Sequence, residues 1–273
     1  MIVNADSAQL YRDLDIVSAR PTAGELRRAE HRLYGVRDGT DPCSAAAWAA
    51  LARAEIAAIH AGRRLPILVG GTGLYLRTLI DGIAPIPPIE PAIREEVRSA
   101  PVAANHAALQ LLDSEAAARL RPTDTTRIAR ALEVVRSTGR PIAAWQAKRS
   151  GGIGSDIVLH PVILLPPREW LYERCDARFA TMLDSGGLKE IEALLARNLD
   201  HALPVMRAIG VAEIAAMLLG RASRDETLAA GARATRQYAK RQYTWFANQP
   251  PVAWERIHEV PGEEVLEAFG DSF

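Results

Sequence analysis

Residues 65–75 read LPILVGGTGLY, an apolar run that leads directly into a glycine-rich turn. A short apolar run bounded by turn residues predicts a buried strand, and the apolar residues beyond the glycines predict a helix. The chain opens on MIV, residues 1–3, which predicts the end of a second buried strand. An alanine-rich helical pattern occupies residues 44–62. Strands that alternate with helices and are apolar on both faces predict an α/β protein whose parallel sheet is covered on both sides.

A proline-rich segment, APIPPIEP at residues 84–91, marks the clearest boundary in the chain. It predicts an α/β core that begins at 1–83, a helical insertion at 84–155, and a return to the core at 156–273 with helical segments at about 184–247. Within these parts the sequence predicts helices at 109–120, 127–135 and 168–184, a flexible glycine connector at 151–155, and strands at 158–165 and 252–257.

The composition excludes several classes of protein. Basic and acidic residues number 33 each, so no overall charge attracts nucleic acid or an anionic membrane, and any nucleic-acid site must be local. Cys43 and Cys175 lie far apart without CxxC spacing, which argues against a zinc site and a disulfide scaffold. No apolar run approaches the roughly 20 residues that span a bilayer, and no leader pattern opens the chain. We therefore expect a cytoplasmic protein with no membrane partner and no metal-ligating residues.

Two polar side chains follow the two predicted strands. Asp6 comes directly after the first strand, and ligands of open α/β sheets bind beyond the carboxyl ends of strands, so this acid is well placed for catalysis. Capping the next helix is the alternative role for Asp6. Thr72 follows glycines that let a ligand approach closely, and its hydroxyl can donate to a phosphate oxygen. An ordinary strand-to-helix turn is the alternative there, because the P-loop pattern GxxxxGK[ST] occurs nowhere in the sequence.

A basic stretch at residues 231–248 contains no acidic residue and interleaves cationic with aromatic side chains. On a helix, Arg233, Arg236 and Lys240 share one face. Basic groups that neutralise phosphates, beside aromatic rings on which bases stack, are suited to binding an RNA loop. A solvated basic helix that packs through its aromatic residues is the alternative.

A pair of arginines, Arg127 and Arg130, lies one turn apart on the helix predicted at 127–135. Paired arginines can clamp a phosphate. They can equally pair with Asp124 or Glu133, which stand three residues away from them. The sequence leaves these two interpretations open.

Seven stretches resemble the tRNA dimethylallyltransferase family. They are DSAQLY at 6–11, SARP at 18–21, HRLYGVRD at 31–38, LVGGTGLY at 68–75, RIARALEV at 127–134, AIGVAEI at 208–214 and ATRQYAKRQYTW at 234–245. Their order and spacing match the family from the first residues to about Trp245, and seven motifs in register rarely arise by chance. The resemblance implies an α/β fold of the P-loop nucleoside triphosphatase and nucleotide-kinase type, with a helical insertion.

The resemblance also implies an activity: transfer of a dimethylallyl group from dimethylallyl diphosphate to the exocyclic amine of the adenosine 3′ of the anticodon, in tRNAs that read codons starting with U. The expected partners are therefore a tRNA anticodon stem-loop and dimethylallyl diphosphate, and a monomer is expected. The positions that match the family's tRNA contacts are Asp6, Ser7, Ala8, Gln9, Thr72, Arg94, Thr126, Arg127, Ile128, Ala129, Arg130, Arg207, Ala208, Ile209, Gly210, Val211, Ala212, Thr235, Arg236, Gln237, Tyr238, Ala239, Lys240, Arg241 and Gln242.

The chemistry of this transfer suits the residue types. An exocyclic amine is a poor nucleophile, so a carboxylate that accepts its proton would help, which is the catalytic role expected for Asp6. The leaving diphosphate develops negative charge and needs preorganised donors with magnesium. Thr72, a matched catalytic position, and Arg20 are candidates to supply such donors. The base must leave its stack to reach the acid.

The sequence departs from the family at its start. Members begin with a strand and GPTxSGK[ST], whose loop holds the diphosphate, and this unit is absent. A reading frame begun too late and a true truncation are the two interpretations, and we predict the first because an enzyme without the loop could not hold its donor. The activity of the 273-residue chain is thus open.

Two further functions stay open, an inactive tRNA-binding remnant and an isopentenyltransferase that acts on free adenine nucleotides. Retention of Asp6 and Thr72 favours an active enzyme over the remnant. The long segments matched to tRNA contacts, at 207–212 and 233–242, argue against free nucleotides as acceptors.

Overall fold

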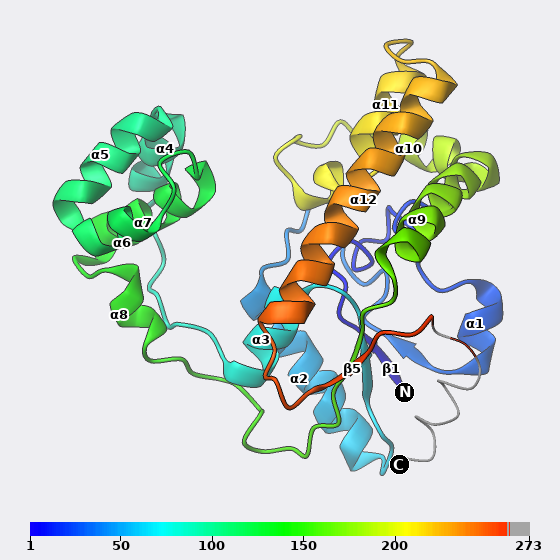
Figure 1. The fold of residues 1–273 in the computed structure, drawn as a ribbon, viewed down its shortest axis with the longest axis horizontal. Helices are drawn as coiled ribbons and strands as arrows, with labels where there is room; N and C mark the ends of the chain where they lie inside the picture. Colours follow the sequence, from blue (N-terminus) through cyan, green and yellow to red (C-terminus); the bar gives the residue numbers. More distant parts are fainter. Residues whose placement is uncertain (261, 263–273) are drawn as a thin grey trace. The chain divides into compact units, whose positions relative to one another are not determined.

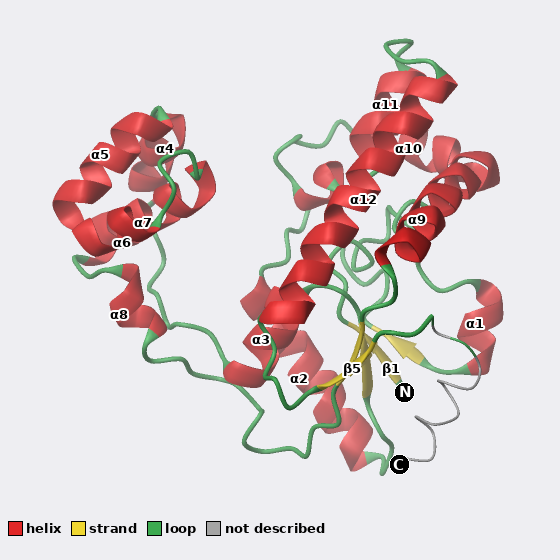
Figure 2. Ribbon diagram, in the orientation of Figure 1, coloured by secondary structure: helices red, strands yellow, loops and turns green. Residues whose placement is uncertain are grey.

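The computed structural model describes residues 1–260 and 262, and within them three short strands form a parallel sheet. The strands are β1 (Ile2–Asn4), β2 (His31–Arg32) and β3 (Ile67–Val69), in the order β2-β1-β3. Ile2 pairs with His31 on one side and Ile67 on the other. The parallel sheet of an α/β fold, predicted from the sequence, is confirmed (Figure 2).

The chain divides into two compact units. The first consists of Met1–Arg77 with the described residues from Val158 onward, and the second is Thr78–Ile157. Helix α3 (Gly73–Asp81) begins in the first unit and ends in the second. Among the described residues no helix is both long and apolar enough to cross a membrane.

Helix α2 (Ala45–Ala61) packs its apolar side against the three-stranded sheet. Ser44 caps the helix by accepting the N–H of Ala47. Trp48 is fully buried, its indole N–H donates to the carbonyl of Asn4 over 3.0 Å, and its ring stacks on Tyr75 with centroids 4.6 Å apart. This one side chain therefore ties α2 to the end of β1 and to α3.

A second parallel pair, β4 (Val162–Leu164) with β5 (Glu255–Ile257), belongs to the same unit. Both strands are shorter than the predicted spans, 158–165 and 252–257. Pro161 precedes β4 and Pro166 follows it, and proline lacks the N–H that would extend the ladder. Val158 is 85% exposed and lies outside the strand.

The remaining helices of the first unit follow β4, except for α1 (Ala23–Arg28) near the start of the chain. Helix α9 (Arg168–Met182) packs along α12 (Arg224–Asn248), the longest helix among the described residues (Figure 1). Between them along the chain lie a π-helical turn (Leu183–Gly187), α10 (Leu188–Ala196), a 3₁₀ turn (Pro204–Arg207) and α11 (Val211–Leu218).

The sheet is less covered than the sequence predicts. Ile67 and Val69 of the edge strand β3 are 48% and 49% exposed, and Leu164 of β4 is 51% exposed. The expectation that both faces are covered is therefore wrong at these strands, where these side chains are about half exposed.

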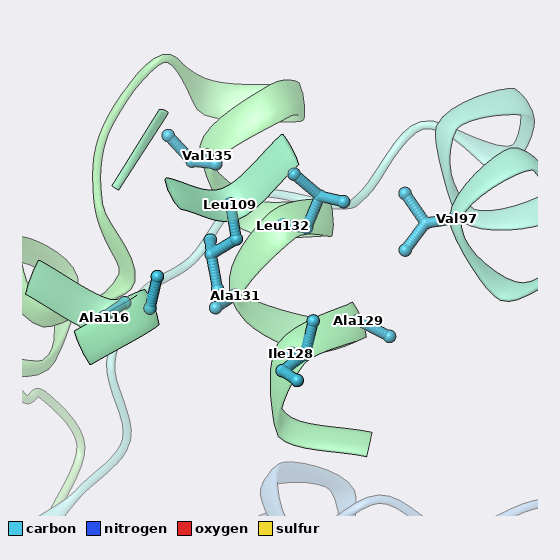
Figure 3. Packing of buried hydrophobic residues seen from close by; sticks show 9 residues of the cluster. Val97, Leu109, Ala116, Ile128, Ala129, Ala131, Leu132 and Val135 are labelled. Atoms are coloured by element: carbon cyan, nitrogen blue, oxygen red, sulfur yellow. The ribbon is translucent and has the colours of Figure 1, made fainter. Parts of the chain in front are cut away.

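The second unit is helical, with α4 (Pro91–Ser99), α5 (Val102–Leu112), α6 (Ser114–Arg119), α7 (Thr125–Thr138) and α8 (Ile142–Gln146). Helix α7 ends on Gly139, whose φ of 68° is left-handed. Figure 3 shows the core of this unit, which consists of Val97, Leu109, Ala116, Ala117, Ile128, Ala129, Ala131, Leu132 and Val135.

Two sequence expectations are wrong in this unit. The single helix expected at 109–120 is broken at Asp113, which ends α5 with a φ of −150° and caps α6 by accepting the N–H of Ala116. The connector at 151–155 is not a free glycine linker. The N–H groups of Ile153 and Gly154 donate to the carbonyls of Leu79 and Ile80, which ties the segment to the end of α3.

Replacing Trp48 with alanine should lower the free energy of unfolding by about 3–5 kcal/mol, because it removes a fully buried ring and leaves a cavity. Leu111→Ala is the control, since Leu111 is 89% exposed and its loss should change stability by no more than about 0.5 kcal/mol. Urea unfolding of both variants measures the difference. Equal stabilities would show that Trp48 does not hold α2 on the sheet.

Candidate active site

Asp6 and Thr72 meet at the carboxyl ends of neighbouring strands. Because β1 pairs with β3 in parallel, with Asn4 beside Val69, the segments after the two strands leave the sheet side by side. The N–H of Ser7 donates to the hydroxyl of Thr72 over 3.0 Å, and that hydroxyl lies 3.3 Å from the Ser7 hydroxyl. The fold thus joins the two candidates that the sequence places at separate strand ends.

Asp6 holds its own loop in shape. Its Oδ1 accepts the N–H of Ala8 over 2.8 Å and the N–H of Gln9 over 3.4 Å, while its own N–H donates to Oδ1 of the buried Asn4. The amide of Asn4 also donates to the carbonyl of Leu33. The alternative role expected for Asp6 is to cap a helix. Residues 7–20 form no helix, so Asp6 caps a turn instead.

The electrostatic surroundings of Asp6 favour proton uptake. Burial raises the pKa of its carboxyl, and the two backbone hydrogen bonds and the Arg178 guanidinium lower it in part. Burial, followed by the charge of Asp6, raises the pKa of the Tyr34 and Tyr238 hydroxyls. The carboxyl thus lies close enough to two phenols and a guanidinium to act on them. A carboxylate with a raised pKa is a stronger base than an exposed one.

Gln9 is fixed by a turn that another helix holds. Its side-chain amide donates to the carbonyls of Ser18 and Ala19 over 3.0 and 2.8 Å. The preceding backbone N–H groups, at residues 15–17, all donate to the carboxylate of Glu190 on α10. Glu190 therefore supports the turn on which the Gln9 side chain rests.

Arg20, the residue expected to bind phosphate, is engaged within the protein. Its Nε donates to Asp15 over 2.8 Å, and its side chain is 20% exposed. The ion pair uses one donor of the fork, so the guanidinium retains further N–H groups.

Helix α12 closes over the glycine turn after β3. The amide of Gln242 donates to the carbonyl of Gly71 over 3.0 Å. A Cβ on Gly71 would lie 2.1 Å from that amide nitrogen, and one on Gly73 would lie 2.4 Å from the Trp245 ring. Gly71 and Gly73 thus let α12 approach the turn, and the approach of a ligand to it stays a prediction of the sequence.

Residues of α12 matched to tRNA contacts divide into engaged and exposed groups. Arg236 pairs with Asp176 of α9, and the Arg241 guanidinium stands 5.5 Å above the Tyr238 ring. Arg236 is thus not wholly free to meet RNA. The exposed matched residues of this helix are Gln237, Lys240 and Arg241, and Arg233 at the start of the same segment is exposed as well.

The segment 207–212 crosses from the 3₁₀ turn into α11. Arg207 and Ala212 are exposed, whereas Gly210 and Val211 are buried. Gly210 has a φ of 96°, in the left-handed region, and its N–H donates to Glu213 over 3.0 Å. Only part of this segment can therefore touch a ligand directly.

The other matched residues belong to the helical unit. Arg94 is exposed on α4, and Arg127 pairs with Asp124 over 3.4 Å. Nη1 of Arg130 lies 3.8 Å from Oε2 of Glu133. Arg127 and Arg130 thus both lie beside the acidic residues that the sequence offers as their partners, although 76% of the Arg127 side chain is exposed.

Two residues of the site were missed from the sequence. Arg178 acts on Asp6 from α9, and Glu190 supports the Gln9 turn from α10. The spacing of Arg174 and Arg178, one helical turn apart, was the available signal, but nothing in it indicates which strand end the helix covers. In the described part of the chain no group of three or more histidine, cysteine or acidic side chains could hold a metal ion.

Comparison with known proteins gives one consistent family. Residues 9–249 match the family model of IPP transferases. A tRNA dimethylallyltransferase of Novosphingobium aromaticivorans is 61% identical over 94% of this chain and 92% of its own length. One from Sphingopyxis alaskensis is 62% identical over 97% of this chain and 87% of its own length. The tRNA isopentenylpyrophosphate transferase structure from Bacillus halodurans superimposes with a TM-score of 0.67 at 31% identity, covering 99% of this chain and 86% of that one.

Replacing Asp6 with asparagine should stabilise the fold at about pH 7, because asparagine keeps the Oδ1 acceptor and needs no desolvated charge. The raised pKa of Asp6 means that its contribution to stability is full below the ordinary value of 3.8 and is lost as pH rises through the raised value. The gain should therefore shrink as the pH falls toward 3.8.

Urea unfolding across this pH range measures the gain, with Glu192→Gln on the exposed side of α10 as the control. A gain that does not change with pH, or a wild-type protein more stable than Asp6→Asn at about pH 7, would contradict the raised pKa.

Proposed function

Because this chain belongs to the IPP transferase family, with relatives that are tRNA dimethylallyltransferases, we propose that it transfers a dimethylallyl group to tRNA. The donor is dimethylallyl diphosphate. The acceptor is the exocyclic amine of the adenosine 3′ of the anticodon, in tRNAs that read codons starting with U. The observation that carries the proposal is the partly buried Asp6 carboxyl, beside Thr72 at the carboxyl ends of two parallel strands.

Asp6 acts as the general base. The amine nitrogen forms a bond to the allylic carbon, the carbon–oxygen bond to diphosphate breaks, and the nitrogen passes a proton to Asp6. The pKa raised by burial suits this role, because the carboxylate then accepts a proton more readily than an exposed aspartate. The N–H groups of Ala8 and Gln9 occupy Oδ1, which leaves Oδ2 for the amine.

Negative charge develops on the diphosphate as its bond to the allylic carbon breaks. Arg178 is exposed and acts on Asp6 through space, so it can meet an oxyanion that leaves from the same spot. Thr72 and the remaining N–H groups of Arg20 are further donors. Magnesium would bind the diphosphate oxygens of the donor, as Mg²⁺ often does with substrate phosphates.

Each unit by itself carries residues suited to tRNA. Exposed cations on α12, Lys240 and Arg241, are suited to phosphates, while Tyr238 offers a ring near Asp6. Arg94 and Arg127 serve the same purpose on the helical unit. The target base leaves its stack to reach the partly buried carboxyl.

The finer architecture forms part of the same proposal. The sheet is of the P-loop nucleoside triphosphatase type, and the helical unit is the insertion expected at 84–155. The parallel order of β2, β1 and β3 and the compact unit Thr78–Ile157 support this. The monomeric state and the cytoplasmic location stay predictions of the sequence.

A transfer assay tests the function. An unmodified anticodon stem-loop is incubated with dimethylallyl diphosphate and magnesium, with the 273-residue chain and with the chain extended upstream in its reading frame. Mass spectrometry should detect one added dimethylallyl group. The Asp6→Ala version of the active protein should bind the stem-loop normally and lose about 10²–10⁴-fold in turnover, because the general base is gone.

Two controls identify the acceptor. A stem-loop with inosine in place of the target adenosine lacks the amine and should receive no group, and AMP should be a poor acceptor. Preferred transfer to AMP would support an isopentenyltransferase of free nucleotides. RNA binding without transfer by any version would support the inactive remnant, and unchanged turnover in Asp6→Ala would remove Asp6 from the mechanism.

A further inference from the structure

A fully buried carboxylate, Glu133, lies within the helical unit on α7. Its Oε1 accepts a hydrogen bond of 2.8 Å from Nε of Arg98 on α4. Its Oε2 is buried without a hydrogen bond and lies 3.8 Å from Nη1 of Arg130. Burying an ionised carboxylate is costly unless cations pair with it closely, and here one of its two oxygens is left without a close partner.

The guanidinium groups around Glu133 reach the surface. The side chain of Arg98 is 64% exposed and that of Arg130 is 42% exposed. The one hydrogen bond that Arg98 makes to the described residues uses Nε, so both terminal nitrogens are left for a ligand. The hydrogen bond from Nε to Glu133 thus fixes the Arg98 guanidinium on its buried side. The two terminal nitrogens stay on the solvent side.

Positive charge exceeds negative charge at this place. Burial lowers the pKa of Arg130, Glu133 opposes that shift, and the charges of Arg94 and Arg98 lower the pKa further. Three guanidinium groups are therefore near enough to interact around one carboxylate. A ligand with negative charge would relieve their repulsion.

Other carboxylates of α4 and α7 do not neutralise this cluster. Glu96 pairs with Arg136 over 2.8 Å, and Asp124 pairs with Arg127 over 3.4 Å. Glu95 is exposed and lies on α4 about a quarter-turn from Arg94. Glu90, the residue before α4, is exposed one turn from Arg94, so the excess of positive charge is carried by Arg98 and Arg130 around the single carboxylate of Glu133.

We propose that Arg98, next to the matched tRNA positions Arg94 and Arg130, contacts a phosphate of the RNA backbone, and that Glu133 is the positioning residue for Arg98. The inference rests on the proposed function, since it assigns the anion to the RNA substrate. A guanidinium fork matches two phosphate oxygens at once, and a carboxylate that holds Nε leaves the terminal nitrogens oriented for that contact.

Binding of a fluorescent anticodon stem-loop, measured over a range of salt concentrations, tests the role of Arg98. Arg98→Gln should weaken binding by about 5- to 30-fold, as expected for the loss of a charge-assisted contact. It should also reduce the slope of log Kd against log salt by about 0.7–0.9, because one phosphate contact is lost. Arg119→Gln, at an exposed arginine on α6 of the same unit, should change neither quantity.

Glu133→Gln tests the positioning role through the sign of its effect. If Glu133 only repels RNA, removal of its charge tightens binding and overturns the assignment. If Glu133 orients Arg98, binding weakens, so that the KM for the stem-loop rises while kcat at saturating RNA stays unchanged. A lowered Tm with unaltered affinity would show a purely structural role and would likewise overturn it.

The outcomes separate this inference from the function on which it rests. A wild-type protein that binds and modifies the stem-loop, with Arg98→Gln equal to it in Kd and salt slope, overturns the phosphate site alone. Equal losses in Arg98→Gln and Arg119→Gln would overturn it as well, since the effect would then be one of net charge. A wild-type protein that binds no stem-loop contradicts the proposed function together with this site.

Discussion

The hydrogen bond from the Ser7 N–H to the Thr72 hydroxyl joins two segments that are 65 residues apart in sequence. It can form only because β1 and β3 pair in parallel, so that both chains leave the sheet at the same edge. The Asp6 turn and the glycine turn before α3 meet at this edge, and α12 covers it through Gln242. The candidate active site therefore depends on strand pairing rather than on any single motif.

Burial of the Asp6 carboxylate costs free energy, and hydrogen bonds from backbone N–H groups take the place of part of its lost hydration. Two N–H groups point at Oδ1 of Asp6, and a guanidinium acts on it from α9, yet burial still raises its pKa. The helical unit shows a related arrangement, in which buried Glu133 is held by arginines whose ends reach solvent. Asp6 is partly buried and Glu133 is fully buried, and each carboxyl is held by hydrogen bonds from groups that lie around it.

The sequence predicts the strand ends well. At both places a short apolar run is followed directly by turn-forming or polar residues, GGTG after Val69 and Asn4–Ser7 after Val3, and this pattern is typical of a strand that ends in a turn. The general behaviour of parallel sheets then places Asp6 near Thr72. The contributions of Arg178 and Glu190 could not be predicted, since they come from α9 and α10, and the packing of those helices leaves no mark in local patterns. The break at Asp113 was hidden for a similar reason, because the alanine-rich residues around it continue a helical pattern.

A double-mutant cycle on the transfer rate tests most directly whether the strand pairing builds one catalytic unit. Asp6→Ala and Thr72→Val are measured singly and together in the active protein, under single-turnover conditions with the anticodon stem-loop. The account predicts a coupling of about 0.5–3 kcal/mol between the two substitutions, because both residues fix Ser7 and its turn. Effects that add to within about 0.3–0.5 kcal/mol would show two independent residues and would contradict it.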